Sequence, residues 1–150
     1  MVAIGWSASV QMLIMSASWI GVMRILAMYG DSPLAGFTIA MRVMVFAFLP
    51  AWGTANAAAT LVGQNLGALK PERAERSAWI AGHYNAVLLV TWGVAFLAVP
   101  DWIIGLFTAD EVVAAYAVQS LRSVAVAFPF FAYGMVLTQS FNGAGDTVTP

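Results

Sequence analysis

The polar side chains that could act on a ligand lie inside apolar stretches of this sequence. Asn56, Thr60 and Gln64 recur at intervals of four residues, which places them on one face of a helix. Glycine and alanine surround them, so the face could be a close helix–helix contact in which amides hydrogen-bond across the interface. The same face could instead line a polar cavity between helices. Gln139, in a later apolar stretch, is a further candidate for that cavity.

Two arginines, Arg42 and Arg122, lie about nine to eleven residues inside apolar stretches. A guanidinium can extend along a helix to reach water, or it can face other helices and pair with an acid or a carbonyl. No acidic residue lies deep in these stretches, so a deep partner is expected from outside the chain. We predict an interior position for Arg42 and leave both alternatives open for Arg122.

The histidine and the aromatic residues have weaker functional signals. His83 is the single histidine, and near a helix end it is expected to be amphipathic rather than a proton relay. The run 128–131 together with Tyr133 is aromatic and could contribute to a pocket for flat organic cations. Packing or lipid contact is the favoured interpretation of these rings.

The composition excludes several classes of function. Apolar residues make up 61% of the chain and charged residues 9%, with a mean hydropathy of +0.84, whereas soluble domains carry roughly 25% charged residues. Six basic residues and a net charge of −1 give no nucleic-acid-binding face. The chain has no cysteine, and no nucleophile–base pair, metal-ligand cluster or phosphate-binding loop is visible. We therefore expect neither an enzyme, nor a metal site, nor a cofactor.

Four apolar stretches are long enough to cross a bilayer, which takes about 20 residues in a helix. The sequence predicts an all-α membrane protein with transmembrane helices at about 2–29, 34–66, 77–99 and 112–141. Pro50 and Pro129 lie inside two of these helices and are expected to kink them. Between the last two helices, residues 101–111 include a short apolar segment suited to the membrane interface.

The basic residues predict how the chain is oriented in the membrane. The 67–76 loop holds Lys70, Arg73 and Arg76, whereas the other two connections hold acidic residues and no basic ones. Because basic residues concentrate in cytoplasmic loops, the 67–76 loop and both chain ends are predicted to be cytoplasmic.

Two segments of the sequence resemble a known family. The runs 55–68 and 70–74 are similar to the signature of multidrug and toxic compound extrusion (MATE) transporters at the end of the second helix of a six-helix lobe. The run 141–150 is similar to the exit from the fourth helix of such a lobe, and 34–42 resembles the start of the second. The matching motif residues at the helix ends are Gly63, Asn65, Gly67, Gly143 and Gly145.

The resemblance implies a fold and an activity. Residues 1–150 then form part of a six-helix lobe in a twelve-helix transporter. The residue types at 63–67, together with an arginine at position 42, resemble those of the second lobe and favour helices seven to ten. It implies a multi-pass protein of the bacterial inner membrane that exports amphipathic or cationic organic compounds in exchange for protons or sodium ions, by alternating access. The four glycines of the motif then read as positions of backbone freedom. The coupling site is expected outside this chain, because no carboxylate lies at depth. Its expected partners are lipid, small organic substrates and the remaining helices of the transporter.

Two other functions are compatible with the sequence. A lipid-linked sugar flippase of the same superfamily would share the architecture but would need a strongly cationic cavity, for which Arg42 and Arg122 are the available residues. The alternative from a different class is a small four-helix membrane subunit that is complete at this length. A stop codon after Pro150 would favour this subunit, whereas two further helices would favour the transporter fragment.

Overall fold

The computed structural model describes residues 2–146, and within the first fifteen it describes the side chains of Val10, Leu13 and Ile14 alone. The described part of the chain is all helical, which confirms the predicted all-α membrane fold. The helices are α1 (Val2–Ala27), α2 (Asp31–Gly67), α3 (Pro71–Ala98), α4 (Pro100–Gly105), α5 (Glu111–Ala125) and α6 (Phe128–Ala144).

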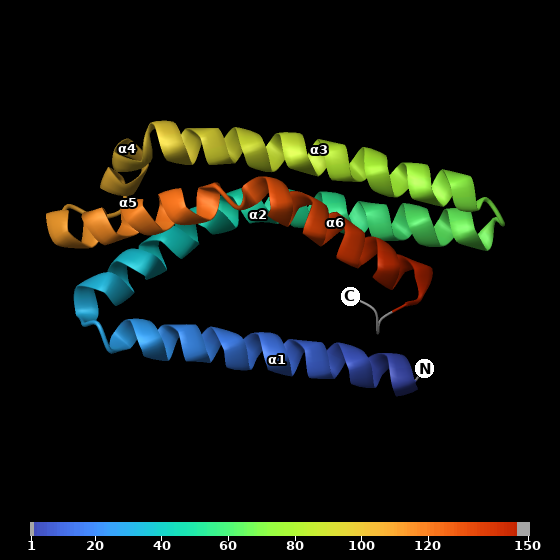
Figure 1. The fold of residues 1–150 in the computed structure, drawn as a ribbon, viewed down its shortest axis with the longest axis horizontal. Helices are drawn as coiled ribbons and strands as arrows, with labels where there is room; N and C mark the ends of the chain where they lie inside the picture. The colour runs from blue at the N-terminus through green and yellow to red at the C-terminus, as the bar shows by residue number, and fades with distance from the viewer. Residues whose placement is uncertain (1, 147–150) are drawn as a thin grey trace.

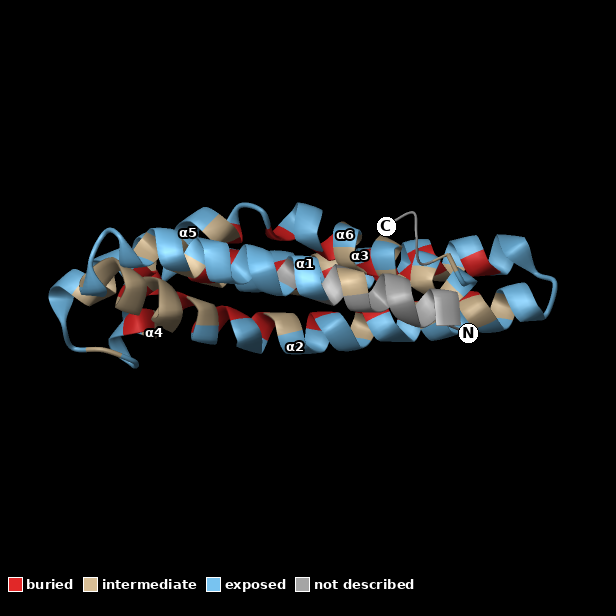
Figure 2. Cartoon of the chain, turned by 90° about the horizontal axis from the view of Figure 1, so that it is seen from below, coloured by how far each residue is buried: buried red, intermediate tan, exposed pale blue. Residues whose placement is uncertain are grey.

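Helices α2, α3, α5 and α6 pack together, and α4 covers one end of α3 and α5 (Figure 1). Helix α1 runs along this bundle but touches it mainly through α2. Figure 2 shows α1 exposed over most of the length for which its side chains are described. The large apolar side chains on it, among them Leu13, Ile20 and Ile25, are therefore available to lipid or to other helices.

Two of the described helices, α2 and α3, are each long and apolar enough to cross a membrane, and the bent pair α5–α6 makes a third candidate. At about 1.5 Å per residue, the 37 residues of α2 are roughly 55 Å long, which exceeds a bilayer core of about 30 Å. The helix accommodates this length by bending (Figure 1), with Pro50 inside it. The predicted first span falls partly on side chains outside the described ones, and its described part, Ser16–Ala27, is a shorter apolar helix.

The connection between α2 and α3 is shorter than predicted. The sequence suggested a loop at 67–76 and a helix start near 77, but α3 begins at Pro71 and the connection is residues 68–70. Proline is well placed at the first position of a helix because it has no amide hydrogen to satisfy, and Glu72 adds a favourable charge to the first turn. The charged stretch was mistaken for a loop although its glutamates, arginines and alanines all favour helix.

The predicted fourth span is broken into two helices. Helices α5 and α6 meet at residues 126–127 with a bend of 58°. Pro129 lies directly after this break, and its missing amide hydrogen leaves no i to i−4 bond for the carbonyl of Ala125. The kink predicted at Pro129 is therefore present, as an interruption of the helix.

Two kinds of packing hold the bundle together. Along α2, small residues are buried in a stripe against α3, α5 and α6, with Gly36 facing the backbone of α5. The other members of the stripe are Ala40, Ala47, Ala51, Ala55 and Ala58. Near the α5–α6 break, the rings of Phe48, Phe96 and Phe128 form an aromatic core, with centroid distances of 5.4 Å for Phe48–Phe128 and 5.8 Å for Phe96–Phe128. Small residues let helix backbones approach, and the rings pack against one another between the helices.

The start of α1, the α2–α3 connection and the end of α6 lie at the same end of the bundle (Figure 1). The other end carries the α1–α2 connection, the short helix α4 and the start of α5. Asp110 fixes the start of α5, because its carboxylate accepts from the amides of Val112 and Val113 at 2.9 and 3.0 Å. The basic connection therefore lies at the same end of the bundle as the start of α1 and the end of α6, and the cytoplasmic location of that end stays a prediction.

Candidate functional site

Helices α2 and α6 touch backbone to backbone at two of the motif glycines. A Cβ atom on Gly63 would lie 2.9 Å from the carbonyl oxygen of Gly143, and one on Gly143 would lie 2.7 Å from the Cα of Ala59. We call Gly63, Gly143 and Ala59 the glycine contact. These glycines are needed for close approach, so the interpretation of all four motif glycines as positions of backbone freedom is wrong for this pair. Gly145 does have a left-handed conformation, with φ of 88°, and ends α6, whereas Gly67 faces open space.

A row of three amides lies next to the glycine contact and joins the same two helices. Gln139 donates from Nε2 to Oδ1 of Asn56 at 2.7 Å, and Asn142 donates from Nδ2 to Oε1 of Gln139 at 2.9 Å. We call these three residues the amide row. The bond between Gln139 and Asn56 joins α6 to α2, as expected for a helix–helix contact. Asn56 is also exposed on the surface of the chain, so the row presents polar groups outward as well.

The other candidates on α2 divide between local bonds and open surface. Thr60 donates to the carbonyl of Asn56 at 3.1 Å, a bond within the helix. Gln64 is exposed, and its side chain forms no hydrogen bond with a described residue. Asn65 bonds the carbonyl of Leu61 at 2.8 Å and Oγ of Ser77 at 3.3 Å, which ties α2 to α3.

The two arginines within the apolar stretches have different surroundings. Arg42 is exposed on α2 in the bundle that this chain forms, and its position inside the complete helix bundle, with a partner from outside this chain, stays a prediction. Arg122 has an ion-pair partner in this chain: its Nη2 lies 3.6 Å from Oδ2 of Asp101, with both side chains more than half exposed. The sequence placed Asp101 in an outer loop, but α4 folds back along α5 and brings the carboxylate to the level of Arg122.

Two buried polar residues of the described chain, Asn85 and Ser140, were not identified from the sequence. Ser140 donates to the carbonyl of Val136 within its own helix at 2.7 Å. Asn85 of α3 is fully buried, and its Nδ2 donates to the carbonyl of Ala132 at 3.0 Å. Its Oδ1 has no hydrogen-bond partner among the described residues. An amide within an apolar helix is itself a signal of a specific contact, and that signal was available at position 85. Gly93, two turns further along α3, faces the carbonyl of Ala125 at the break, so α3 supports the bent pair at two levels.

The aromatic candidates serve mainly in packing. Phe128 is fully buried in the aromatic core, whereas Phe130 is 82% exposed. Tyr133 contacts the ring of His83 edge-on at 5.8 Å and lies 6.4 Å from that of Trp79. His83 Nδ1 is 2.6 Å from the carbonyl oxygen of Trp79. Because a carbonyl can only accept, Nδ1 carries the hydrogen in this contact.

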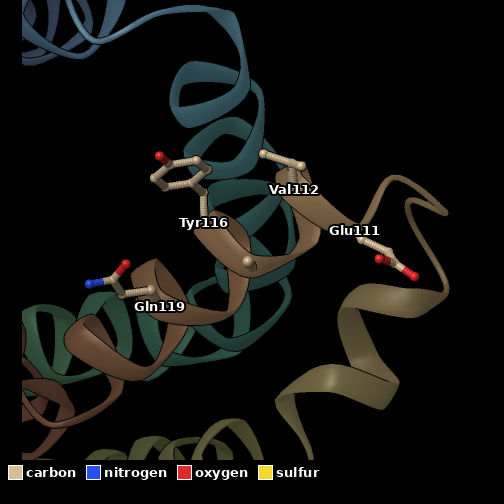
Figure 3. Close-up of a pocket in the computed structure, with 5 residues that line it drawn as sticks. Glu111, Val112, Tyr116 and Gln119 are labelled. Atoms are coloured by element: carbon tan, nitrogen blue, oxygen red, sulfur yellow. The ribbon is translucent and has the colours of Figure 1, made fainter.

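A shallow hollow of about 410 Å³ lies on the outer face of α5, lined by Glu111, Val112, Ala115, Tyr116 and Gln119 (Figure 3). It contains none of the residues predicted from the sequence as cavity-lining. In Figure 3 the side chains of Glu111 and Gln119 point away from each other, so their polar atoms do not converge on a common ligand position. The amide row next to the glycine contact remains the better candidate for a functional site, since hydrogen bonds hold its three side chains together.

A family profile decides between the classes of membrane protein. The MatE profile matches residues 7–150. The chain belongs to the MatE family. This confirms the resemblance noted in the two helix-end motifs, and it makes the glycine contact and amide row features of a MatE helix bundle.

Curated relatives agree with the MatE assignment. The MatE chain is 26% identical over 142 residues to a probable multidrug resistance protein YpnP of Bacillus subtilis, covering 95% of this chain and 32% of that protein. It is 24% identical over 147 residues to a probable multidrug resistance protein NorM of Caulobacter vibrioides, covering 98% and 31%. A NorM of Thermotoga maritima is 25% identical over 150 residues, covering 98% and 32%. The MatE chain therefore spans about a third of the length of these relatives.

Proposed function

We propose that this MatE chain forms part of one lobe of a secondary transporter that exports amphipathic or cationic organic compounds. The relatives named as multidrug resistance proteins support the substrate class. The observation that carries the proposal is the amide row, which presents polar edges on the outer surface of two apolar helices. Lipid cannot satisfy such groups, so this face belongs against other helices or a water-filled cavity.

The proposal extends to the mechanism and its coupling. Protons or sodium ions move inward as substrate leaves, and two lobes expose a central cavity alternately to each side of a bacterial inner membrane. Within 2–146 the acidic residues lie at the helix ends and connections rather than deep in the apolar segments. The coupling ion is therefore held by carboxylates of other segments. The 68–70 connection and both ends of the chain lie on the cytoplasmic side, and the lobe is the second of the transporter.

A flippase for lipid-linked sugars is the second candidate, and the structure makes it weaker. Such a protein needs unpaired cationic groups in its cavity to hold a pyrophosphate. Arg122 is paired with Asp101. Among the described residues this leaves Arg42 as the exposed arginine well inside an apolar segment, because Arg24 is in the last turn of α1. One guanidinium is a poor match for two phosphate charges, so export of organic cations is the better proposal.

The test is export by the full-length protein in an efflux-deficient bacterial strain. We expect higher tolerance to cationic dyes and quinolones, and we expect Asn56→Ala and Gln64→Ala to reduce it more than Trp92→Ala does. Trp92 is the control because its ring packs on Phe96, away from the amide row. Protein levels in the membrane are measured for each variant. No change in tolerance with the protein present overturns drug export, and equal losses that follow protein level overturn the role of the polar face.

A further inference from the structure

A second hollow, of about 290 Å³, lies where α2 ends and α3 begins, and it is lined by Asn65, Arg73, Arg76, Ser77 and Ile80. The four lining residues of α3 share one face, because they are three, four and seven positions from the first. The hollow therefore combines two guanidinium groups, two small polar groups and one apolar side chain. None of these residues belongs to the amide row.

The polar floor of the hollow is held in place by hydrogen bonds. Asn65 donates to Oγ of Ser77 at 3.3 Å and to the carbonyl of Leu61 at 2.8 Å. Ser77 in turn donates to the carbonyl of Arg73 at 2.7 Å. These bonds use the donors of Asn65 and Ser77 internally, so the donors available to a ligand are those of the arginines.

The two arginines are exposed and form no ion pair with a described residue. Glu72 and Glu75 precede them directly in the sequence, yet neither carboxylate pairs with either guanidinium. Lys70 lies just before the same helix and adds positive charge outside the lining. A guanidinium presents a planar set of donors that matches the oxygens of a phosphate. Two of them on one helix face favour an anion with several oxygens.

The depth of the hollow in the membrane follows from the length of α3. Its 28 residues are roughly 42 Å long, about 12 Å more than the hydrocarbon core. The charged residues of α3 are confined to its first six positions, 71–76, so the excess length belongs at this end and places Arg73 and Arg76 among lipid headgroups. Ile80 lies one turn deeper, where the acyl chains begin.

We propose that this hollow binds the phosphate of an anionic phospholipid, with Arg73 and Arg76 on the phosphate oxygens and Ile80 against the glycerol and upper acyl chain. Basic hollows between helices at the cytoplasmic face suit anionic headgroups. A lipid rather than a free phosphate is favoured because the hollow has an apolar side and opens at headgroup depth. The motif residue Asn65 then has a role in shaping a lipid site. This proposal does not depend on the compound that the transporter exports.

The test is lipid enrichment around the purified full-length protein. The protein is extracted from membranes of phosphatidylglycerol and phosphatidylethanolamine, and retained lipids are counted by native mass spectrometry. We expect roughly tenfold to thirtyfold enrichment of phosphatidylglycerol, since each basic residue near the surface contributes attraction to anionic lipid. Arg73→Gln/Arg76→Gln should reduce the enrichment to nearly none. Arg24→Gln, at the opposite end of the bundle, should change the enrichment by less than about twofold, and Lys70→Gln, beside the hollow but outside its lining, by no more than about fivefold.

Additional variants and a competition with inorganic phosphate distinguish a lipid site from a free-anion site. Arg73→Lys/Arg76→Lys keeps the charge without the planar donors and should give intermediate enrichment, and it serves if the glutamine variant does not fold. Equal enrichment in all variants overturns the proposal. Displacement of phosphatidylglycerol by excess inorganic phosphate, with the same dependence on the two arginines, overturns the lipid assignment in favour of a free-anion site. Loss of enrichment with dye export intact supports the lipid site and leaves the proposed function standing.

Discussion

The glycine contact and the aromatic core hold the same helices together by opposite means. At the glycine contact, Gly63 and Gly143 leave no room between α2 and α6 for one added carbon atom. In the aromatic core, the rings of Phe48, Phe96 and Phe128 pack together next to the 58° bend of α5–α6. The first region is sensitive to added volume and the second to lost volume. Substitutions that add a carbon atom and substitutions that remove a ring should therefore destabilise the bundle at different places.

Removal of a ring from the aromatic core should have the largest effect. Phe128→Ala removes a fully buried side chain and should destabilise the protein by about 3–5 kcal/mol, because a cavity remains. Thermal unfolding of the full-length protein in detergent measures this effect. Phe130→Ala, two residues away and 82% exposed, is the control and should cost less than about 1 kcal/mol. Equal losses in the two variants contradict the assignment of the core.

Addition of one carbon at the glycine contact should have the next largest effect. Gly143→Ala places a Cβ against the backbone of Ala59 and should cost about 1–3 kcal/mol by overpacking. Gly134→Ala lies in the same helix, has open space around it and should stabilise α6 by up to about 1 kcal/mol through helix propensity. The same unfolding measurement applies. If Gly143→Ala is as stable as Gly134→Ala, α2 and α6 do not touch here.

The amide row should contribute the least to stability. Gln139→Leu removes its bond to Asn56 of α2, which should cost about 0.6 kcal/mol as a typical hydrogen bond between membrane helices. The same change removes the bond to Asn142 within α6, which should bring the total to about 1 kcal/mol. A double-mutant cycle with Asn56→Leu isolates the pair, and Gln119→Leu on the surface of α5 is the control. A coupling energy of zero, with export still impaired, would assign these amides to substrate contact alone.

The sequence predicted most of the fold because hydropathy and proline act locally. The apolar segments, the interruption near Pro129 and the common side of both ends all follow from residue types along the chain. The start of α3 at Pro71 was missed because charge was taken as a sign of a loop. Charged residues are common in the first turns of a membrane helix, which lie among headgroups.

The candidate site was only partly predictable, because contacts between helices depend on register. The four-residue spacing placed Asn56 on one face, but nothing in the sequence paired it with Gln139, which is 83 positions away. The exposure of Arg42 and the partner of Arg122 depend in the same way on how neighbouring helices are rotated. Asn85 was identifiable as an unusual residue, whereas its bond to Ala132 required the fold.

The three-residue connection between α2 and α3 has a consequence for biosynthesis. A loop this short lets the two helices close on each other as soon as α3 is made, since little loop entropy opposes their contact. Gly143 is 80 positions after Gly63, so at 5–20 residues per second it leaves the ribosome roughly 4–16 s later. Helices α2 and α3 therefore enter the bilayer as a hairpin, with the surface that α6 will cover still open to lipid.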